Sequence, residues 1–127
     1  MSIRSETCLA KDFTCMSCFA VKGEVCICEG IKDDYGKPPV GLLSTAALIE
    51  MSKVLAYGEG HYGRHNWRKG IAWQRLINAA LRHILAFNGG EDKDEATGIS
   101  HIAHAMCMLM FLLEEEQTRV DLDDRYK

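Results

Sequence analysis

The sequence predicts an all-α fold: a small helical bundle with an N-terminal cysteine-rich arm that is a candidate for zinc binding. Apolar residues recur at helical spacing in three segments separated by turns, and no segment alternates apolar and polar residues as a strand does. Five of the six cysteines lie within the first 28 residues, outside those segments. We therefore expect a cysteine-rich arm over 1–31, a helical domain over 32–116 and a charged tail over 117–127.

The first helix is expected to begin near Ser44, which can cap it, and to end near Tyr57, because glycines follow at positions 58 and 60. One residue of this helix interrupts its pattern: Glu50 falls in the middle of the arc of apolar side chains. A buried carboxylate needs a partner. We expect Glu50 either to pair with a basic side chain of another helix or to act directly, as a metal ligand or catalytic group.

The second helix is expected over 73–87 and the third over about 99–116. The glycine pair at 89–90 ends the second helix. The third is apolar on nearly every side, which is typical of the central buried element of a bundle. Two neighbouring helices would not cover it fully, so we predict a further partner and a homo-oligomer.

Composition narrows the class of protein. The chain has 127 residues, of which 47% are apolar and 26% charged, as in ordinary globular domains. No apolar run approaches the roughly 18 residues of a membrane span, and the first residues lack the apolar segment of a signal peptide. We therefore expect a cytoplasmic protein without membrane association. The net charge of −3 argues against broad nucleic-acid binding, which depends on a surplus of Lys and Arg.

The clustered cysteines favour metal binding over disulfides, because the chain carries no export signal. Cys15 and Cys18 have the spacing of a zinc knuckle, and Cys26 and Cys28, which are closer together than usual, could complete a four-thiolate site for Zn²⁺. The alternative is a set of reduced cysteines in a loosely packed arm. The role of Cys8 stays open between a spare and a substitute ligand.

A turn rich in carboxylates leads directly into the third helix. Carboxylates at four positions supply hard oxygen ligands, namely Glu91, Asp92, Asp94 and Glu95. His101 and His104 lie three residues apart, hence about 60° apart on one helical face. One small divalent ion could reach both sets, so the segment predicts a metal or phosphate site. The alternative is that these carboxylates only complement the dipole of the helix.

Donors for phosphate and rings for stacking on a base gather in the loop between the first two helices. A lysine after a glycine turn and a histidine at the edge of the apolar face of the second helix are further candidates. Exposed loops also hold such residues without function, and a single histidine of this kind is often a hydrogen-bonded core residue. The candidate substrate-binding residues are Lys37, Tyr62, Asn66, Trp67, Arg68, Lys69 and His83.

Several common catalytic motifs are absent from the sequence. It contains no P-loop, no Gly-x-Ser-x-Gly elbow, no Gly-x-Gly-x-x-Gly and no His-Glu-x-x-His. These absences argue against several hydrolase and dinucleotide-binding classes.

Six motifs follow one another in order along the helical domain: Asp34-x-Gly36-Lys37-Pro38, Leu42-Leu43, Val54-Leu55-x-Tyr57-Gly58, Tyr62-Gly63-x-x-Asn66-Trp67-Arg68-Lys69-Gly70, Ala79-Ala80-x-Arg82-His83 and Gly90-Glu91-Asp92-x-Asp94-x-x-x-Gly98-x-x-His101-x-x-His104-Ala105. Over about residues 32–115 this order resembles the N-terminal domain of a phage-encoded family of dATP/dGTP diphosphohydrolases. His61 stands where the family usually has lysine, and the cysteine arm lies outside the resemblance.

The resemblance implies hydrolysis of a purine deoxynucleoside triphosphate to the monophosphate and pyrophosphate, a divalent cation, and a place in viral control of the nucleotide pool in the host cytoplasm. Our first hypothesis is therefore a hydrolase with Mg²⁺ or Mn²⁺ at the acidic and histidine site. His101 or His104 would orient or deprotonate the attacking water, together with Glu50. The alternative is a non-catalytic nucleotide- or protein-binding module, a phage accessory or host-defence-antagonist protein, stabilised by zinc.

Overall fold

The computed structural model describes residues 32–127. The chain divides into two compact units, Met1–Leu42 and Leu43–Lys127. The described part of the first unit contains a turn and a short 3-10 helix, η2, at Val40–Leu42. The candidate zinc ligands Cys15, Cys18, Cys26 and Cys28 lie outside the described residues, as does Cys8.

The second unit is built from three α-helices, α1 (Thr45–Tyr62), α2 (Trp73–Asn88) and α3 (His101–Thr118). Short 3-10 helices follow α1 and α3, η3 at Asn66–Lys69 and η4 at Val120–Leu122. Within 32–127 there is no strand, only an isolated β-bridge, so the predicted all-α class is confirmed for this part of the chain. None of the helices in these residues has the length and apolar character that a bilayer crossing requires.

Helix α1 begins as expected but ends five residues later than expected. The hydroxyl of Ser44 accepts a hydrogen bond from the N–H of Ala47 and caps the helix. The helix continues through the glycines at 58 and 60, because a glycine inside a helix costs only about 1 kcal/mol relative to alanine. It ends at Gly63, whose φ of 87° lies in the region that glycine adopts readily.

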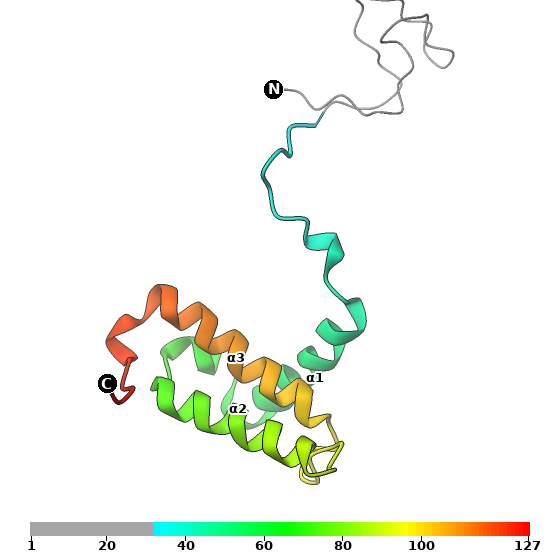
Figure 1. The fold of residues 1–127 in the computed structure, drawn as a ribbon, viewed down its shortest axis with the longest axis vertical. Coiled ribbons are helices and arrows are strands. Elements are labelled where there is room, and N and C mark those ends of the chain that lie inside the picture. The colour runs from blue at the N-terminus through cyan, green and yellow to red at the C-terminus, as the bar shows by residue number, and fades with distance from the viewer. Residues whose placement is uncertain (1–31) are drawn as a thin grey trace, which may run out of the picture. The chain divides into compact units, whose positions relative to one another are not determined.

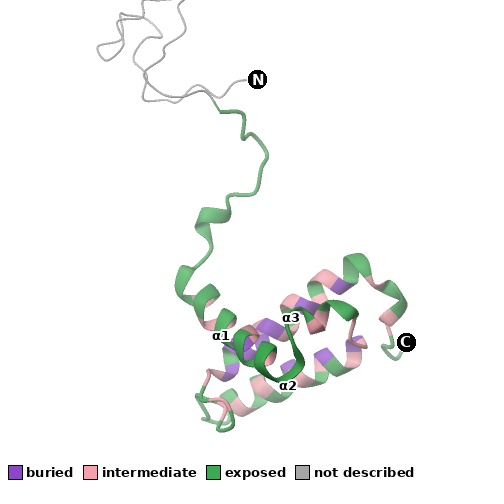
Figure 2. Ribbon diagram, turned by 180° about the vertical axis from the view of Figure 1, so that it is seen from behind, coloured by how far each residue is buried: buried purple, intermediate pink, exposed green. Residues whose placement is uncertain are grey.

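Helices α2 and α3 lie side by side, and α1 packs on α3 (Figure 1). The shared core is formed by Val54 of α1, Leu76 of α2, and Ala103, Cys107 and Phe111 of α3. Most buried positions belong to α3, whereas α1 contributes only one (Figure 2). This agrees with the expectation that the third helix is the central element. The helix starts at His101 rather than near residue 99, because Ser100 caps it.

The expectation that Glu50 is buried is wrong. Its side chain is 45% exposed and pairs with Lys53, one turn further along the same helix. The apolar arc around Glu50 is not covered by the other helices, since Leu48 and Ile49 are also exposed and Val54 is the first buried residue of α1. A metal or catalytic role for Glu50 therefore stays a prediction without a supporting contact among the described residues.

Apolar side chains on α3 also reach the surface, with Leu109 and Leu113 both exposed. The homo-oligomer expected from the apolar character of this helix stays a prediction.

The C-terminal residues pack against the loop before α2. Arg119 donates from Nη1 to the carbonyl oxygen of Lys69 at 2.9 Å, and the buried Glu115 accepts the N–H of Ile71 at 2.8 Å. Gly70, with a φ of 98°, lies against this contact, and a Cβ there would come within 2.6 Å of Leu122. The loop that carries the basic residues is therefore fixed from behind by α3 and η4.

Replacing Leu76 by alanine should lower the free energy of unfolding by about 2–5 kcal/mol, because the side chain is only 2% exposed within the core. Urea denaturation followed by the helical circular dichroism signal measures this change. The matched control is Leu85→Ala on the same helix, at a position 66% exposed, which should change stability by less than about 0.5 kcal/mol. An equal loss in both variants would contradict the assigned core.

Candidate functional site

Three histidines meet where α2 passes the start of α3. The Nδ1 atoms of His83, from α2, and His101, from α3, are 2.9 Å apart. The ring of His83 also stacks on that of His104, with centroids 4.5 Å apart and an angle of 11° between the planes. His101 and His104 are buried, and His83 is half-buried. His101 and His104, which are three residues apart on α3, thus both contact the imidazole of His83 from the neighbouring helix.

The loop before α3 adds carboxylates to this cluster. Asp94 accepts hydrogen bonds at Oδ2 from the N–H and the hydroxyl of Thr97, at 3.1 and 2.9 Å. The same hydroxyl lies 2.8 Å from Nε2 of His104. On the other side, Nε2 of His101 lies 3.3 Å from a carboxylate oxygen of Glu91. Each of the two histidines of α3 therefore has a polar partner from the acidic loop.

The surroundings of His83 and His104 favour their neutral forms. Burial lowers the pKa of His83 below its ordinary value, and the neighbouring His104 and His101 lower it further. Burial also lowers the pKa of His104, against the opposing effect of Asp94. A neutral imidazole keeps a lone pair on one nitrogen, which is the form that binds a metal ion or accepts a proton.

One group of side chains among residues 32–127 has the geometry of a metal site. His83, Asp94 and His101 each offer a ligand atom, and these atoms all lie within 4.8 Å of one another. Asp94 and His101 belong to the metal set expected from the sequence, whereas His83 was expected among the substrate-binding residues. Glu91 bonds to His101 of this group, and His104 is connected to Asp94 through the hydroxyl of Thr97. Asp92 and Glu95, which were also expected as ligands, are exposed.

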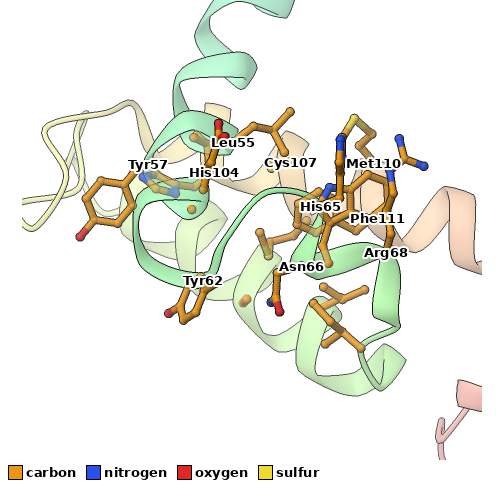
Figure 3. A pocket seen from close by; sticks show the side chains of 18 of the residues that line it. Leu55, Tyr57, Tyr62, His65, Asn66, Arg68, His104, Cys107, Met110 and Phe111 are labelled. Atoms are coloured by element: carbon orange, nitrogen blue, oxygen red, sulfur yellow. The ribbon is translucent and has the colours of Figure 1, made fainter.

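An open cleft of about 1230 Å³ lies next to this cluster and is walled by the end of α1, the loop around η3, and one side each of α2 and α3 (Figure 3). His104 lines the cleft and, through its stacked partner His83, joins it to the candidate metal group. Pockets for small ligands generally have volumes of about 300–1,000 Å³, so the cleft is large enough for a nucleotide.

Basic side chains line much of the cleft. Arg64 and Arg68 come from the loop, and each pairs with a glutamate at 2.9 Å. Arg75 and Arg82 come from α2, and within residues 32–127 neither forms a salt bridge. Sequence reasoning did not select these two arginines. Their spacing of seven residues, two helical turns, is the signal that places them on one face.

The loop residues expected to bind substrate differ in their availability. The indole ring of Trp67 stacks on Phe111 at 4.4 Å, and the Arg68 guanidinium lies over the ring at 4.5 Å. Trp67 is thus engaged in packing, whereas Tyr62 is 72% exposed at the end of α1. Asn66 and Lys69 also line the cleft. Lys37 belongs to the other compact unit, where its ammonium bonds to the carbonyl oxygen of Asp33.

Comparisons with known proteins confirm the family that the order of motifs resembles. Residues 29–125 match the model of a family described as dATP/dGTP diphosphohydrolase, N-terminal. A protein of Salmonella phage PMBT28 named dATP/dGTP diphosphohydrolase is 43% identical over 96 residues, which are 76% of this chain and 33% of the relative. The chain thus spans about one third of that relative's length. No solved structure matches the chain. The match over most of its length shows that the chain belongs to the dATP/dGTP diphosphohydrolase family, in the N-terminal region that the family model describes.

Proposed function

We propose that this chain hydrolyses purine deoxynucleoside triphosphates to the monophosphate and pyrophosphate, in viral control of the nucleotide pool. The observation that carries the proposal is the cleft, which has basic side chains and His104 along its walls and lies beside the cluster of His83, Asp94 and His101. Family membership supports the substrate class, because the phage relative carries the name dATP/dGTP diphosphohydrolase.

The triphosphate would lie along the side of the cleft formed by α2 and the η3 loop. Lys69, Arg75 and Arg82 line it and form no salt bridge with any described residue, so their charges are available to phosphate oxygens. Arg68 can contribute only if it leaves Glu114 or shares its guanidinium between the two. Tyr62 is the aromatic ring best exposed for stacking on the base, since Trp67 is already packed on Phe111.

His104 is the residue proposed to accept the proton of the attacking water. The hydroxyl of Thr97 has one proton, which it donates to Asp94, because an ionised carboxylate only accepts. It therefore accepts from Nε2 of His104, and the lone pair of the neutral imidazole is on Nδ1. The water oxygen would bond to the α-phosphorus, its proton would pass to His104, and the bond to the bridging oxygen of the pyrophosphate would break.

The divalent cation expected from the sequence would be held by His83, Asp94 and His101, whose ligand atoms all lie within 4.8 Å of one another. When bound there, it would offset the negative charge that develops on the phosphate oxygens.

The first prediction is release of pyrophosphate from dATP or dGTP by the purified chain in the presence of Mg²⁺ or Mn²⁺. Incubation with each of the eight common nucleoside triphosphates, followed by chromatography of the products, measures it. His104→Ala should reduce the rate by about 10²–10⁴-fold, the usual contribution of a general base. Absence of turnover with all eight nucleotides, with the protein folded and supplied with metal, would refute the proposed hydrolase activity.

The second prediction concerns the two arginines of α2. Arg82→Gln and Arg75→Gln should each weaken nucleotide binding by about tenfold, equivalent to 1.4 kcal/mol, as expected for loss of a charge-assisted hydrogen bond to phosphate. Equilibrium binding of dGTP measures the change. The matched control is Lys53→Gln, which removes one positive charge from α1 at a position that does not line the cleft. Equal affinities in all variants would exclude α2 as the phosphate-binding side.

A second function is favoured by one observation: the chain matches only part of the length of the phage relative. Because the chain corresponds to about one third of that protein, it can represent a non-catalytic module that binds a nucleotide or a protein while the chemistry belongs to other parts of the longer relatives. The zinc-stabilised arm over 1–31 would then form part of a partner surface. Tight binding of dATP or dGTP without any release of pyrophosphate would favour this alternative.

A further inference from the structure

We propose that His83, Asp94 and His101 form a preorganised site for one transition-metal ion of the Mn²⁺, Fe²⁺, Co²⁺ and Zn²⁺ class, in preference to Mg²⁺. The inference deepens the proposed function and rests on it for the role of the ion in the cleft. Binding of the ion itself can be measured without any turnover.

The hydrogen bond of His101 directs its lone pair toward His83. Its Nε2 lies 3.3 Å from Glu91, and a carboxylate only accepts, so Nε2 carries the proton. In a neutral ring the lone pair is then on Nδ1, the atom 2.9 Å from Nδ1 of His83. Without an ion, His83 donates its Nδ1 proton into this contact. If His83 carries that proton on its Nε2 atom instead, the Nδ1 atoms of His83 and His101 both direct a lone pair toward the same point.

The spacing of the two nitrogens suits an ion with several open positions. Adjacent ligands at about 2.1 Å from a six-coordinate ion lie about 3.0 Å apart, close to the observed 2.9 Å between the Nδ1 atoms. Asp94 completes a set of two imidazoles and one carboxylate on one side of the ion. Water or oxygen ligands would take the remaining positions.

The residues around the ligands already fix their orientation. Glu91 holds the ring of His101 from its far nitrogen, and Thr97 holds one carboxylate oxygen of Asp94 with both its N–H and its hydroxyl. Outer partners of this kind set the tautomer of a ligating histidine and raise metal affinity. The ligands therefore do not need to be ordered by the ion.

The donor set discriminates between ions. Mg²⁺ is bound in proteins through oxygen atoms and keeps several of its waters, whereas imidazole nitrogens suit transition metals. Two of the three donors here are imidazoles, so a site built for Mg²⁺ is not what these residues provide.

The test is Mn²⁺ binding to the full chain, followed by loss of the electron paramagnetic resonance signal of the free ion. Mn²⁺ is chosen because thiolates prefer softer ions, so the cysteines do not compete for it. We expect one ion per chain that a large excess of Mg²⁺ does not displace. Glu91→Gln should weaken binding by about tenfold, and Asp94→Asn and His83→Ala should weaken it further.

The matched control is Glu95→Gln, which makes the same charge change in the same loop at an exposed residue outside the ligand group and should leave binding unchanged. Circular dichroism verifies that each variant folds. If Asp94→Asn does not fold, the Mn²⁺ affinity of His83→Ala tests the site instead, because His83 is only half-buried. Unchanged affinity in the ligand variants, or displacement of Mn²⁺ by equal Mg²⁺, would overturn the inference. Mn²⁺ binding without pyrophosphate release would overturn only the proposed function, and release that survives His83→Ala while Mn²⁺ binding is lost would overturn only the role of this ion in the reaction.

Discussion

The contact between the imidazoles of His83 and His101 is the constraint on which the rest of the site depends. It joins α2 and α3, which pack against each other more extensively than any other pair of helices within residues 32–127, and it does so with polar atoms in a partly buried position. A buried polar group left without a partner costs about 1–3 kcal/mol, so the register of α2 against α3 is restricted to arrangements in which the rings meet. Thr97 and Glu91 then satisfy the outer nitrogens of the two histidines of α3, which ties the acidic loop to the same register.

The cleft depends on a second set of contacts at the other end of α3. Phe111 supports the indole of Trp67, and Glu115 binds the backbone of Ile71, so the basic loop is anchored by residues that belong to the core helix. The histidine cluster and the basic loop are therefore positioned by one rigid element, about two to four turns apart along it. A ligand that spans the cleft would bridge groups whose separation is fixed by the helix rather than by the loops.

Local patterns predicted the helices well where one face alone is buried, as for α2, whose apolar residues keep the helical period up to the glycine pair. They misplaced the end of α1, because a helix ends where the backbone needs a positive φ, as at Gly63, and not at every glycine. Glu50 was expected to be buried because helical phase identifies an apolar arc but not whether a neighbour covers it. The sequence indicated Asp94 and His101 as metal ligands, yet adding His83 to them required the pairing of α2 with α3, which no local spacing encodes.

The bond from Arg119 to the carbonyl oxygen of Lys69 connects residues fifty positions apart in the chain. It holds the main chain of the basic loop at the point where the loop turns at Gly70, with Leu122 closing the space behind it. Fixing a residue's backbone costs about 1–2 kcal/mol of conformational entropy. Here that cost is incurred when the domain folds, so for the proposed nucleotide site more of the attraction between loop and ligand would be retained as affinity. A contact behind the loop would thus strengthen binding of the proposed ligand without touching it.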